Sequence, residues 1–277
     1  MIRLKNRFGK ANRKEMSWMS DLMETLRQEG ISPDLLRAVE EYRAAHALPE
    51  ALRPRIPASG FTYYGREVWE QALAALLCGE NLLLAGGKAT GKNVLAENLA
   101  AAFGRPAWDI SFHVNMDAAS LIGMDTFVDG AVTFRPGPVY RCAQCGGFGV
   151  LDEINMAKNE ALTSRFAVIQ MPIITEENLE KLLRAQFADL TDKYVHQFAL
   201  LFLDLQKKCD SAEISTKALD LRGMLDALRL MRRGVAAGPA LDMGITNKAF
   251  DSYEQGLIRD VIAARIPASL TAEKLFR

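Results

Sequence analysis

The 277-residue sequence lacks the features of an exported, membrane-spanning or strongly charged protein. No run of 18 apolar residues is present, so we expect no membrane span. No apolar core follows the basic start, so we expect no signal peptide. Basic and acidic residues number 34 each, which gives a formal net charge of zero. Because no global basic field would attract nucleic acid, nucleic-acid binding is not expected.

Cysteine and histidine are also scarce, with four and three residues. Cys142 and Cys145 form one C-x-x-C pair, but no second Cys pair or His pair lies close by, so a zinc site would be incomplete. The histidines, His46, His113 and His196, are scattered and suggest neither a ligand set nor a catalytic triad. We interpret the cysteines as reduced thiols and expect a cytoplasmic protein.

The composition that is present, 49% hydrophobic and 25% charged, is typical of a globular protein. Residues 1–58 predict a helical N-terminal extension that is closed by the Pro-rich linker "RPRIPASG". The first fourteen residues carry six basic and no acidic side chains. We interpret this segment as a solvated terminal arm, and a docking arm for nucleic acid or a partner is the alternative.

After the linker, short apolar strands alternate with helices, which is typical of a parallel α/β sheet. A helix is expected at 68–77 and another at 92–103, and "TFVDGAVTF" predicts a β-hairpin with a turn at Asp129-Gly130. The expected buried strands are 82–85, 108–112, 148–151 and 166–171. Beyond Pro172 only helical periodicity remains. We therefore expect an α/β core at 59–172 and an α-helical domain at 173–277.

The stretch "LLLAGGKATGKN" joins the first expected strand to the helix that follows. It matches the phosphate-loop pattern G-x-x-x-x-G-K with Gly86, Gly87, Lys88, Ala89, Thr90, Gly91 and Lys92, and Asn93 follows. Glycines allow backbone N–H groups to wrap a β-phosphate, and the start of the helix adds its positive dipole end. Lys92 would reach the β- and γ-phosphates. The position between strand and helix favours phosphate binding over a structural glycine turn.

Two acidic residues, Asp152 and Glu153, end the expected strand in "GGFGVLDEIN". Strand ends of such sheets face the same crevice as the glycine loop. Asp152 can hold Mg²⁺ through water, and Glu153 can polarise an attacking water. Beside the glycine loop, this interpretation is stronger than the alternative of two acids that only cap a strand.

These motifs resemble those of an AAA+ ATPase of the MoxR type. The resemblance covers roughly residues 60 to 265 and is carried by "LLLAGGKATGKN", "VNMDAASLIGMDTF", "FRPGPVYRCAQCGGFGVLDEINMA", "LTSRF" and "LDLRGMLDALRLM". It implies a P-loop AAA+ core with a parallel sheet sandwiched by helices, followed by an all-α lid. It also implies that the protein binds ATP and Mg²⁺. The expected assembly is a homo-oligomeric ring, with a hexamer as the expected form.

The resemblance assigns roles residue by residue. Gly86–Asn93 becomes Walker A, and the strand that ends in Asp152 and Glu153 becomes Walker B. The hairpin at 126–134 becomes the insert of the group. Arg165 of "SRF" becomes the arginine finger toward a neighbouring subunit's γ-phosphate. Arg222 of "LDLRG" becomes the sensor-2 arginine, with Lys217 as the alternative. For each arginine, an ordinary surface or lid salt bridge is the competing interpretation.

The first departure from the family pattern is Asn93, which stands where Ser or Thr is expected. Mg²⁺ prefers a small octahedral shell of oxygen atoms, so the Asn carbonyl or an intervening water can substitute. We therefore assign Asn93 with Asp152 to the metal site and expect weakened Mg²⁺ positioning rather than loss of nucleotide binding.

The second departure is the short span from Asp152 to Arg165, 14 residues. This length allows one crossover between parallel strands but not two crossovers and another strand. The family has five parallel strands, and the missing piece is a helix, a central strand that ends in the polar sensor-1 residue, and the lead-in to "SRF". Because an open groove would leave backbone groups unpaired, we expect the four remaining strands to close into one parallel sheet.

A single "NEAL" string, Asn159–Leu162, is what an excision between two similar strings would leave. Three explanations are open: the printed sequence is incomplete, the deletion is natural, or the chain is engineered. Two functions are considered first. One is a motor that remodels a client protein, often with a von Willebrand factor A domain partner, and the other is a nucleotide-binding scaffold with impaired hydrolysis. A nucleic-acid-directed ATPase is the third and weakest alternative.

Overall fold

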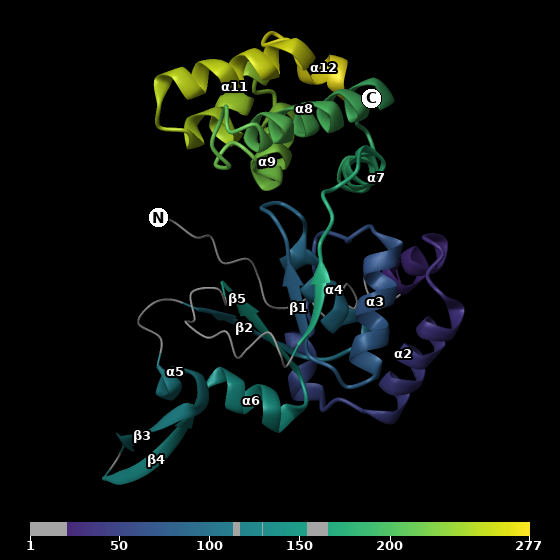
Figure 1. The fold of residues 1–277 in the computed structure, drawn as a ribbon, viewed down its shortest axis with the longest axis vertical. Helices are drawn as coiled ribbons and strands as arrows, with labels where there is room; N and C mark the ends of the chain where they lie inside the picture. The colour runs from purple at the N-terminus through teal and green to yellow at the C-terminus, as the bar shows by residue number, and fades with distance from the viewer. Residues whose placement is uncertain (1–20, 113–116, 129, 154–165) are drawn as a thin grey trace. The chain divides into compact units, whose positions relative to one another are not determined.

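The structure is a computed structural model of the chain, and it describes residues 21–112, 117–128, 130–153 and 166–277. The chain divides into two compact units, residues 1–85 with 91–171 and residues 86–90 with 172–277. In the described residues, all labelled strands belong to the first, which we call the α/β unit, and the second is the helical unit (Figure 1).

The helices of the α/β unit begin and end close to where the sequence predicts them. α3 begins two residues earlier than expected, directly after Gly65, and buries Val68, Trp69 and Leu73. After the helical residues 21–28, the elements are α2 (Pro33–Ala45), the 3-10 helix η1 (Glu50–Arg55), α3 (Arg66–Leu77), α4 (Lys92–Ala102), α5 (Ala118–Ile122) and α6 (Pro138–Cys145).

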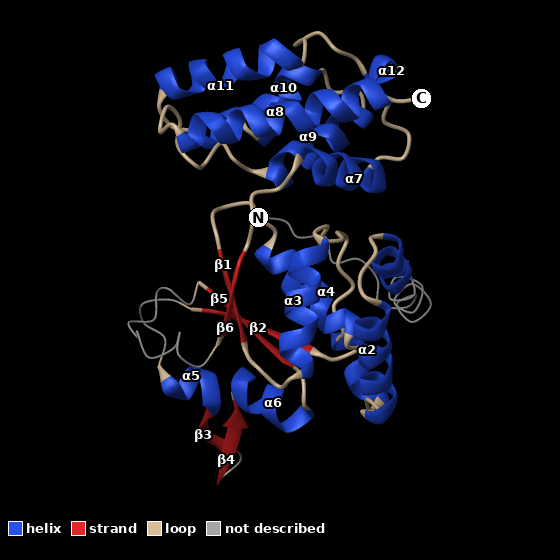
Figure 2. Ribbon diagram, turned by 45° about the vertical axis from the view of Figure 1, so that its right-hand side comes forward, coloured by secondary structure: helices blue, strands red, loops and turns tan. Residues whose placement is uncertain are grey.

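The core of this unit gathers the apolar faces of its N-terminal helices. Figure 2 shows α2, α3 and α4 together on one side of the strands. Leu26, Val39 and Trp69 are buried there, and so is Leu95 of α4. The helices of the expected N-terminal extension therefore contribute buried side chains to the α/β core.

The parallel strands form two separate pairs. β1 (Leu82–Ala85) pairs with β6 (Ala167–Gln170), and β2 (Ala107–Ser111) pairs with β5 (Phe148–Asp152). The antiparallel hairpin of β3 (Gly123–Val128) and β4 (Ala131–Pro136) stands apart from both pairs. Its turn is completed by Gly130 at φ 82°, which favours glycine, and Asp129 lies outside the described residues.

The expectation of one four-stranded parallel sheet is wrong. β6 lies beside β1, as closure requires, but no ladder among the described residues joins β1 to β5. The pairs are held by different helices, because α3 contacts β1 and β6 whereas α6 contacts β2 and β5. Packing against separate helices outweighs the modest net gain from new backbone hydrogen bonds, since edge groups can bond water instead.

The same split corrects a second expectation, that these strands are buried on both faces. All four residues of β1 are only partly buried, and so are most residues of β5. Ile169 of β6 is buried, but its neighbour Val168 is 48% exposed. A strand that has a partner on one side and helices on one face keeps part of its surface open.

The helical unit consists of amphipathic helices around a closed core. α8 buries Val195, Phe198 and Phe202, and Asp220 caps α9 by accepting a hydrogen bond from the Gly223 N–H at 3.1 Å. Its elements are α7 (Glu176–Gln186), α8 (Asp192–Asp210), α9 (Leu221–Arg232), α10 (Ala237–Gly244), the 3-10 helix η4 (Thr246–Lys248), α11 (Ser252–Arg265) and α12 (Ala272–Leu275).

The crossing of α9 and α10 needs glycine on both helices. A Cβ atom at Gly223 would lie 2.0 Å from the Gly244 carbonyl oxygen, which no side chain can adopt. Across the described residues of both units, no helix combines the length and apolar character that crossing a membrane requires.

Candidate nucleotide-binding site

The glycine loop connects β1 to α4, as the sequence predicts. Gly86 and Gly91 have φ angles of 156° and 85°, and Ala89 has a φ of 62°. The left-handed region is costly for a residue with a Cβ atom, so Ala89 carries backbone strain of the kind found at ligand-binding loops. The buried Thr90 hydroxyl donates to the Gly87 carbonyl at 3.1 Å and stabilises the turn.

The amino end of α4 is open to an anion. Its N-cap is Gly91, which offers no side chain to accept a hydrogen bond from the first turn. The first N–H groups of a helix have no partner within the helix, and together with the helix dipole they favour a phosphate. Lys92 is the first residue of α4, so its ammonium group belongs to this helix end.

Asn93 and Asp152 come together although they are far apart in the sequence. The Asn93 amide nitrogen donates to a carboxylate oxygen of Asp152 at 3.0 Å. Asp152 is the last residue of β5, and its neighbour across the ladder is Ser111. The carbonyl oxygen of Asn93 is then the atom of this amide that remains for a cation. Both residues assigned to the metal site thus lie at one place, and an oxygen-rich pair of this kind suits Mg²⁺.

Glu153 follows Asp152 in a strained conformation. Its φ angle is 56°, and its N–H donates to the Asp152 carboxylate at 3.0 Å. Of the non-glycine residues with positive φ in the described ranges, Ala89 and Glu153 fall in the two predicted motifs, and Ala212 lies in a turn after α8. Strain of this kind concentrates at functional sites.

An aromatic segment before α3 packs against the glycine loop, and sequence reasoning missed it. A Cβ atom at Gly91 would lie 3.0 Å from the Tyr63 ring, so a side chain there would press on this ring, and the φ angle of 85° favours glycine independently. The fully buried Asn98 holds the segment, because its amide accepts from the Tyr63 N–H at 2.8 Å and donates to the Phe61 carbonyl at 2.9 Å. The Trp69 indole donates to the Tyr63 carbonyl at 2.9 Å, and burial raises the pKa of the Tyr63 hydroxyl.

The sensor-2 candidates both lie near the start of α9. Arg222 is the second residue of α9 and is exposed, whereas the Lys217 ammonium lies 4.6 Å from the centre of the Phe250 ring. The N-cap Asp220 pairs with Lys248. Burial raises the pKa of Asp220, but the hydrogen bonds from Lys248 and Gly223 outweigh it, and the pKa is lowered. Arg165, the expected arginine finger, lies outside the described residues.

Lys88 of the glycine loop has a partner within the helical unit. Its ammonium group donates to the Thr216 carbonyl at 2.7 Å, in the segment that leads into α9. The sequence pattern treats Lys88 as a variable position of the loop, so this contact had no signal in the motif.

One histidine contact in the helical unit was not indicated by sequence spacing. His196 Nδ1 lies 2.9 Å from Glu180 and 3.0 Å from Glu176, which joins α8 to α7. The ligating atoms of these three residues lie within 4.8 Å of one another. The four cysteines are free thiols, and Cys142 donates to the Gly147 carbonyl at 3.1 Å. His113 lies outside the described residues.

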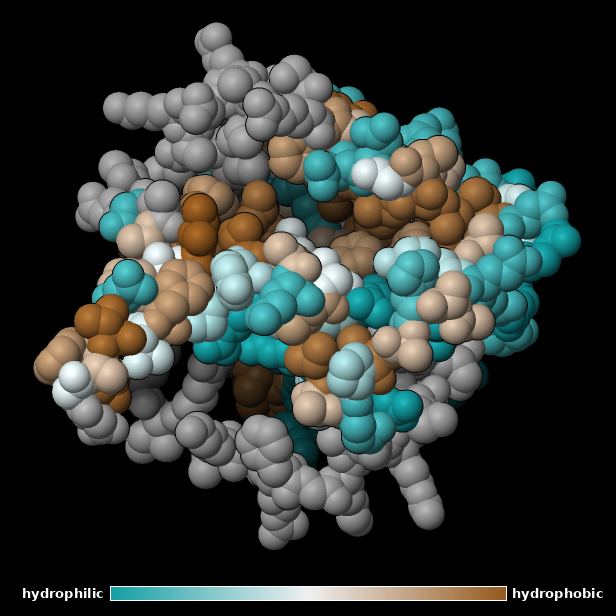
Figure 3. Space-filling view, turned by 90° about the horizontal axis from the view of Figure 1, so that it is seen from below, coloured by the Kyte–Doolittle hydropathy of each residue, from teal (hydrophilic) through white to brown (hydrophobic). Residues whose placement is uncertain are grey.

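The hairpin expected at 126–134 exposes apolar side chains. Phe127 and Val132 face each other across the ladder and are 75% and 70% exposed. In Figure 3 brown apolar residues stand among white and teal ones on the projecting left-hand part, where Figure 1 places β3 and β4. The helix α6 that follows was missed, because it spans only eight residues between Gly137 and Gly146 and begins with a proline, features that are also typical of a loop.

Comparison with known proteins gives one family. The model described as "AAA domain (dynein-related subfamily)" matches residues 81–220, about half of the chain. Uncharacterized protein YojN of Bacillus subtilis (strain 168) is 27% identical over 303 residues, covering 90% of this chain and 98% of that protein. Uncharacterized protein SH1500 of Staphylococcus haemolyticus (strain JCSC1435) is 26% identical over 248 residues, covering 70% and 94%.

Proposed function

We propose that this chain, which belongs to the dynein-related subfamily of the AAA domain family, is an ATPase of the MoxR type that remodels or assembles a client protein. Proteins of this family are P-loop proteins of α/β fold that bind nucleotide, typically with Mg²⁺, and they commonly form rings. A MoxR-type identity, a helical lid, a client and a von Willebrand factor A domain partner are parts of the proposal.

One observation carries the proposal: the hydrogen bond from Asn93 to Asp152. It joins the residue that follows the phosphate-loop lysine to the acid at the end of β5. Both side chains can bind a cation on the nucleotide phosphates there. In P-loop NTPases the cation is likewise held by one residue of the phosphate loop and one acid at a strand end. The strained backbone at Ala89 and Glu153 supports the proposal that the reactive site lies beside Asn93 and Asp152.

The roles follow from chemistry at this place. The loop amides of Gly86–Gly91 and the amino end of α4 bind the phosphates, and Lys92 neutralises their charge. Asn93 and Asp152 hold Mg²⁺, which stabilises the charge on the transferred phosphoryl group. Glu153 orients the attacking water. Arg222 is the better sensor-2 candidate, because Lys217 already lies over the Phe250 ring.

We also propose that the chain lacks a central strand between Glu153 and Arg165. The alignment with the Bacillus subtilis protein extends over 303 residues, more than the 277 of this chain, yet it takes in only nine tenths of the chain. The alignment with the Staphylococcus haemolyticus protein shows a similar excess, since its 248 residues take in seven tenths of the chain. Both relatives therefore have residues inside the aligned span that this chain does not have.

The split sheet favours a second function, a nucleotide-binding scaffold with impaired hydrolysis. β1 and β5 each have one recorded strand partner in the described residues, which is what the loss of a strand between them leaves. The end of that strand supplies the polar sensor-1 residue in the family, so water positioning suffers while the phosphate loop stays intact.

Nucleotide binding and turnover separate these functions. We expect wild type to bind ATP and Lys92→Ala to lose at least tenfold in affinity, since a charged contact is removed. Turnover in wild type that Glu153→Gln abolishes supports the ATPase. Binding without turnover in either protein supports the scaffold, and absence of binding in wild type contradicts both.

Intact mass and assembly test the remaining parts. Mass spectrometry of the protein from its native source should give 30.6 kDa if the deletion is real, and a heavier chain would contradict it. Light scattering with and without ATP tests the ring, for which a hexamer is proposed. The cytoplasmic location stays a prediction. Binding to DNA at low salt would support the nucleic-acid alternative.

A further inference from the structure

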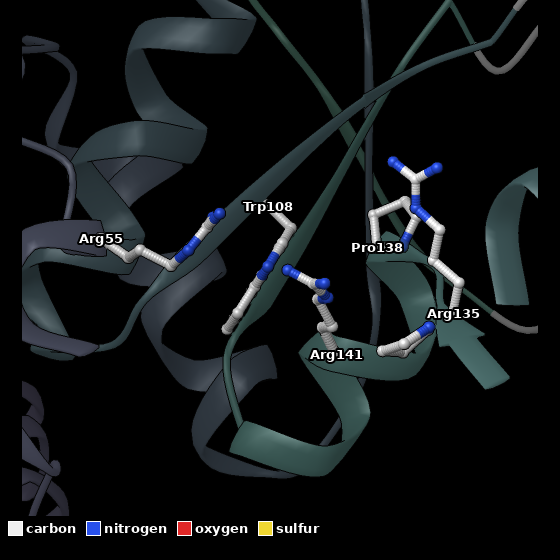
Figure 4. Close-up of a pocket in the computed structure, with 6 residues that line it drawn as sticks. Arg55, Trp108, Arg135, Pro138 and Arg141 are labelled. Carbon is white, nitrogen blue, oxygen red and sulfur yellow. The ribbon is translucent and has the colours of Figure 1, made fainter. Parts of the chain in front are cut away.

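A second site of the α/β unit is a pocket whose lining side chains are hydrogen-bond donors or apolar. It has a volume of about 280 Å³ and is lined by Arg55, Trp108, Arg135, Pro136, Pro138 and Arg141. The residues come from η1, β2, the end of β4 and α6. Figure 4 shows Trp108 between Arg55 and Arg141. Three guanidinium groups without an acidic lining residue make the pocket strongly positive.

The floor of the pocket is a fixed aromatic ring with an unused donor. Trp108 is only 5% exposed, and its indole N–H is buried without a hydrogen-bond partner among the described residues. The ring is clamped, because a Cβ atom at Gly147 would lie 2.3 Å from it. The Arg55 guanidinium lies 4.9 Å from the ring centre, in a cation–π contact. A buried polar group without a partner is rare and calls for an acceptor.

The three arginines of the pocket differ from most other arginines in the described residues, because those form ion pairs with acidic side chains. Within the described residues no ion pair is recorded for Arg55, Arg135 or Arg141, whereas Arg53, two positions before Arg55, pairs with Glu50 at 3.0 Å. Arg55 reaches only a backbone oxygen, that of Ala107, at 3.3 Å. Like charges in one pocket repel each other unless an anion neutralises them.

The pocket is distinct from the nucleotide loop. Trp108 lies opposite Gly149 in the ladder, while Asp152 lies opposite Ser111. Three residues of extended strand separate the two positions by roughly 10 Å. The pocket therefore lies toward the amino end of the β2–β5 pair, whereas Asp152 lies at its carboxyl end.

We propose that this pocket binds an oxyanion of the diphosphate class, either free or as the diphosphate group of a small molecule. Guanidinium groups bind phosphate oxygens through paired N–H donors, and several of them are needed to balance a multiply charged group. The Trp108 ring holds the Arg55 guanidinium at the pocket through the cation–π contact. The volume suits a group of this size better than a large organic ligand.

Calorimetric titration with pyrophosphate tests the site on the full chain that carries Lys92→Ala, so that the phosphate loop contributes little. We expect one site, and we expect inorganic phosphate to bind about tenfold more weakly because it offers fewer charged contacts. ADP that binds as tightly as pyrophosphate assigns the diphosphate to a nucleotide, and ADP that binds more weakly assigns it to the free anion. Failure of pyrophosphate to bind overturns the proposal.

Two substitutions in the Lys92→Ala background place the binding in this pocket. Arg141→Gln should weaken pyrophosphate binding roughly tenfold, since it removes a charged donor to the anion. Trp108→Phe should weaken it severalfold, since a Phe ring holds the Arg55 guanidinium less strongly. The matched control is Arg233→Gln, an exposed arginine of the helical unit without a recorded ion pair, which should leave the affinity unchanged. Equal affinity in all three variants overturns the proposal, and circular dichroism checks that each variant is folded. ATP binding to the Lys92-containing protein is measured separately, so this test can fail without affecting the nucleotide site.

Discussion

The α/β unit and the helical unit differ in how completely they close their cores. In the helical unit, the long helix α8 buries Val195, Phe198 and Leu201 with no exposed surface. In the α/β unit, every residue of β1 stays partly exposed, and the parallel strands stop at two pairs. Full burial of large apolar side chains is the dominant stabilising term, so the two units should respond differently to substitution.

If the proposed loss of a central strand is correct, the comparison shows that its effect stays within the α/β unit. The helices α2, α3 and α4 pack together, because their apolar faces meet one another. The strands depend on neighbours from other parts of the chain, and β1 and β5 have no common neighbour. Helix packing is thus less sensitive than sheet closure to the loss of a single segment.

The largest expected effect tests the difference in core closure. Phe198→Ala should destabilise the helical unit by about 3–5 kcal/mol, because it leaves a cavity in a closed core. Val168→Ala in β6, at a position 48% exposed, should cost less than about 1 kcal/mol. Urea denaturation measures both free energies of unfolding.

The natural probes of the chain make this measurement selective. None of the three tryptophans, Trp18, Trp69 and Trp108, lies in the sequence of the helical unit, and Trp69 and Trp108 belong to the α/β unit, so tryptophan fluorescence follows the α/β unit while circular dichroism follows both. Phe198→Ala should shift the circular dichroism transition and leave the fluorescence midpoint in place. Tyr253→Ala, at a side chain 74% exposed on α11, is the control. A coincident shift in both signals would show that the units unfold as one.

A smaller effect is expected at the buried polar link of the α/β unit. Asn98→Ala removes both partners of the segment before α3 and leaves the Tyr63 N–H and Phe61 carbonyl without them. We expect a loss of about 1–3 kcal/mol, the cost of buried groups left unpaired. The fluorescence midpoint in urea measures it. Gln71→Ala, at an exposed amide that donates to Glu67, should change stability by less than about 0.5 kcal/mol.

Much of the α/β topology could be predicted from local pattern. β1 has the bounds that its apolar run predicts, and α4 begins at Lys92 as expected. The meeting of Asn93 and Asp152 follows from the rule that strand ends face the loop after the first strand. These features depend on residues near in sequence or on a general rule of parallel sheets.

The features that could not be predicted depend on distant partners. The split of the sheet into two parallel pairs depends on how strands from distant parts of the chain pair, and no local pattern records that. Asn98 lies on an apolar helix, and its partners Phe61 and Tyr63 lie more than thirty positions earlier. His196 and Glu180 lie on different helices, so their spacing in the sequence gave no ligand signal.

A more modest effect is expected at the nucleotide loop. Asn93→Thr replaces the amide with a hydroxyl, an oxygen donor small enough for the shell of Mg²⁺. If the proposed ATPase is correct, the Mg²⁺ concentration for half-maximal ATP binding should fall roughly threefold to tenfold, because the cation is better positioned. Asn93→Ala should raise it. ATP binding in EDTA is the control and should be the same in all three proteins, and a change in EDTA would instead place Asn93 at the nucleotide.

The smallest expected effect is in the helical unit, where one polar contact links two helices whose core is already closed. The hydrogen bond from His196 is the main cause that lowers the pKa of the Glu180 carboxyl, with Arg184 adding to it. A carboxyl whose pKa is lower in the folded state stabilises that state above its unfolded pKa of about 4.3, and the contribution is lost as the pH falls through the folded pKa. The pair is partly exposed, so we expect less than about 1 kcal/mol.

Unfolding in urea, followed by circular dichroism between pH 6 and pH 3, measures that contribution. Glu180→Gln should flatten the fall in the stability of the helical unit below about pH 4.3, because the variant has no carboxyl to protonate there. His196→Ala removes the donor and should flatten the same part of the curve. His196 also lies 3.0 Å from Glu176, so His196→Ala should cost more than Glu180→Gln, and the double variant should lose no more than His196→Ala alone. Additive losses would mean that Glu180 is stabilised by Arg184 rather than by His196. The stabilising contact of Glu180 would then lie within α7 and not between α7 and α8.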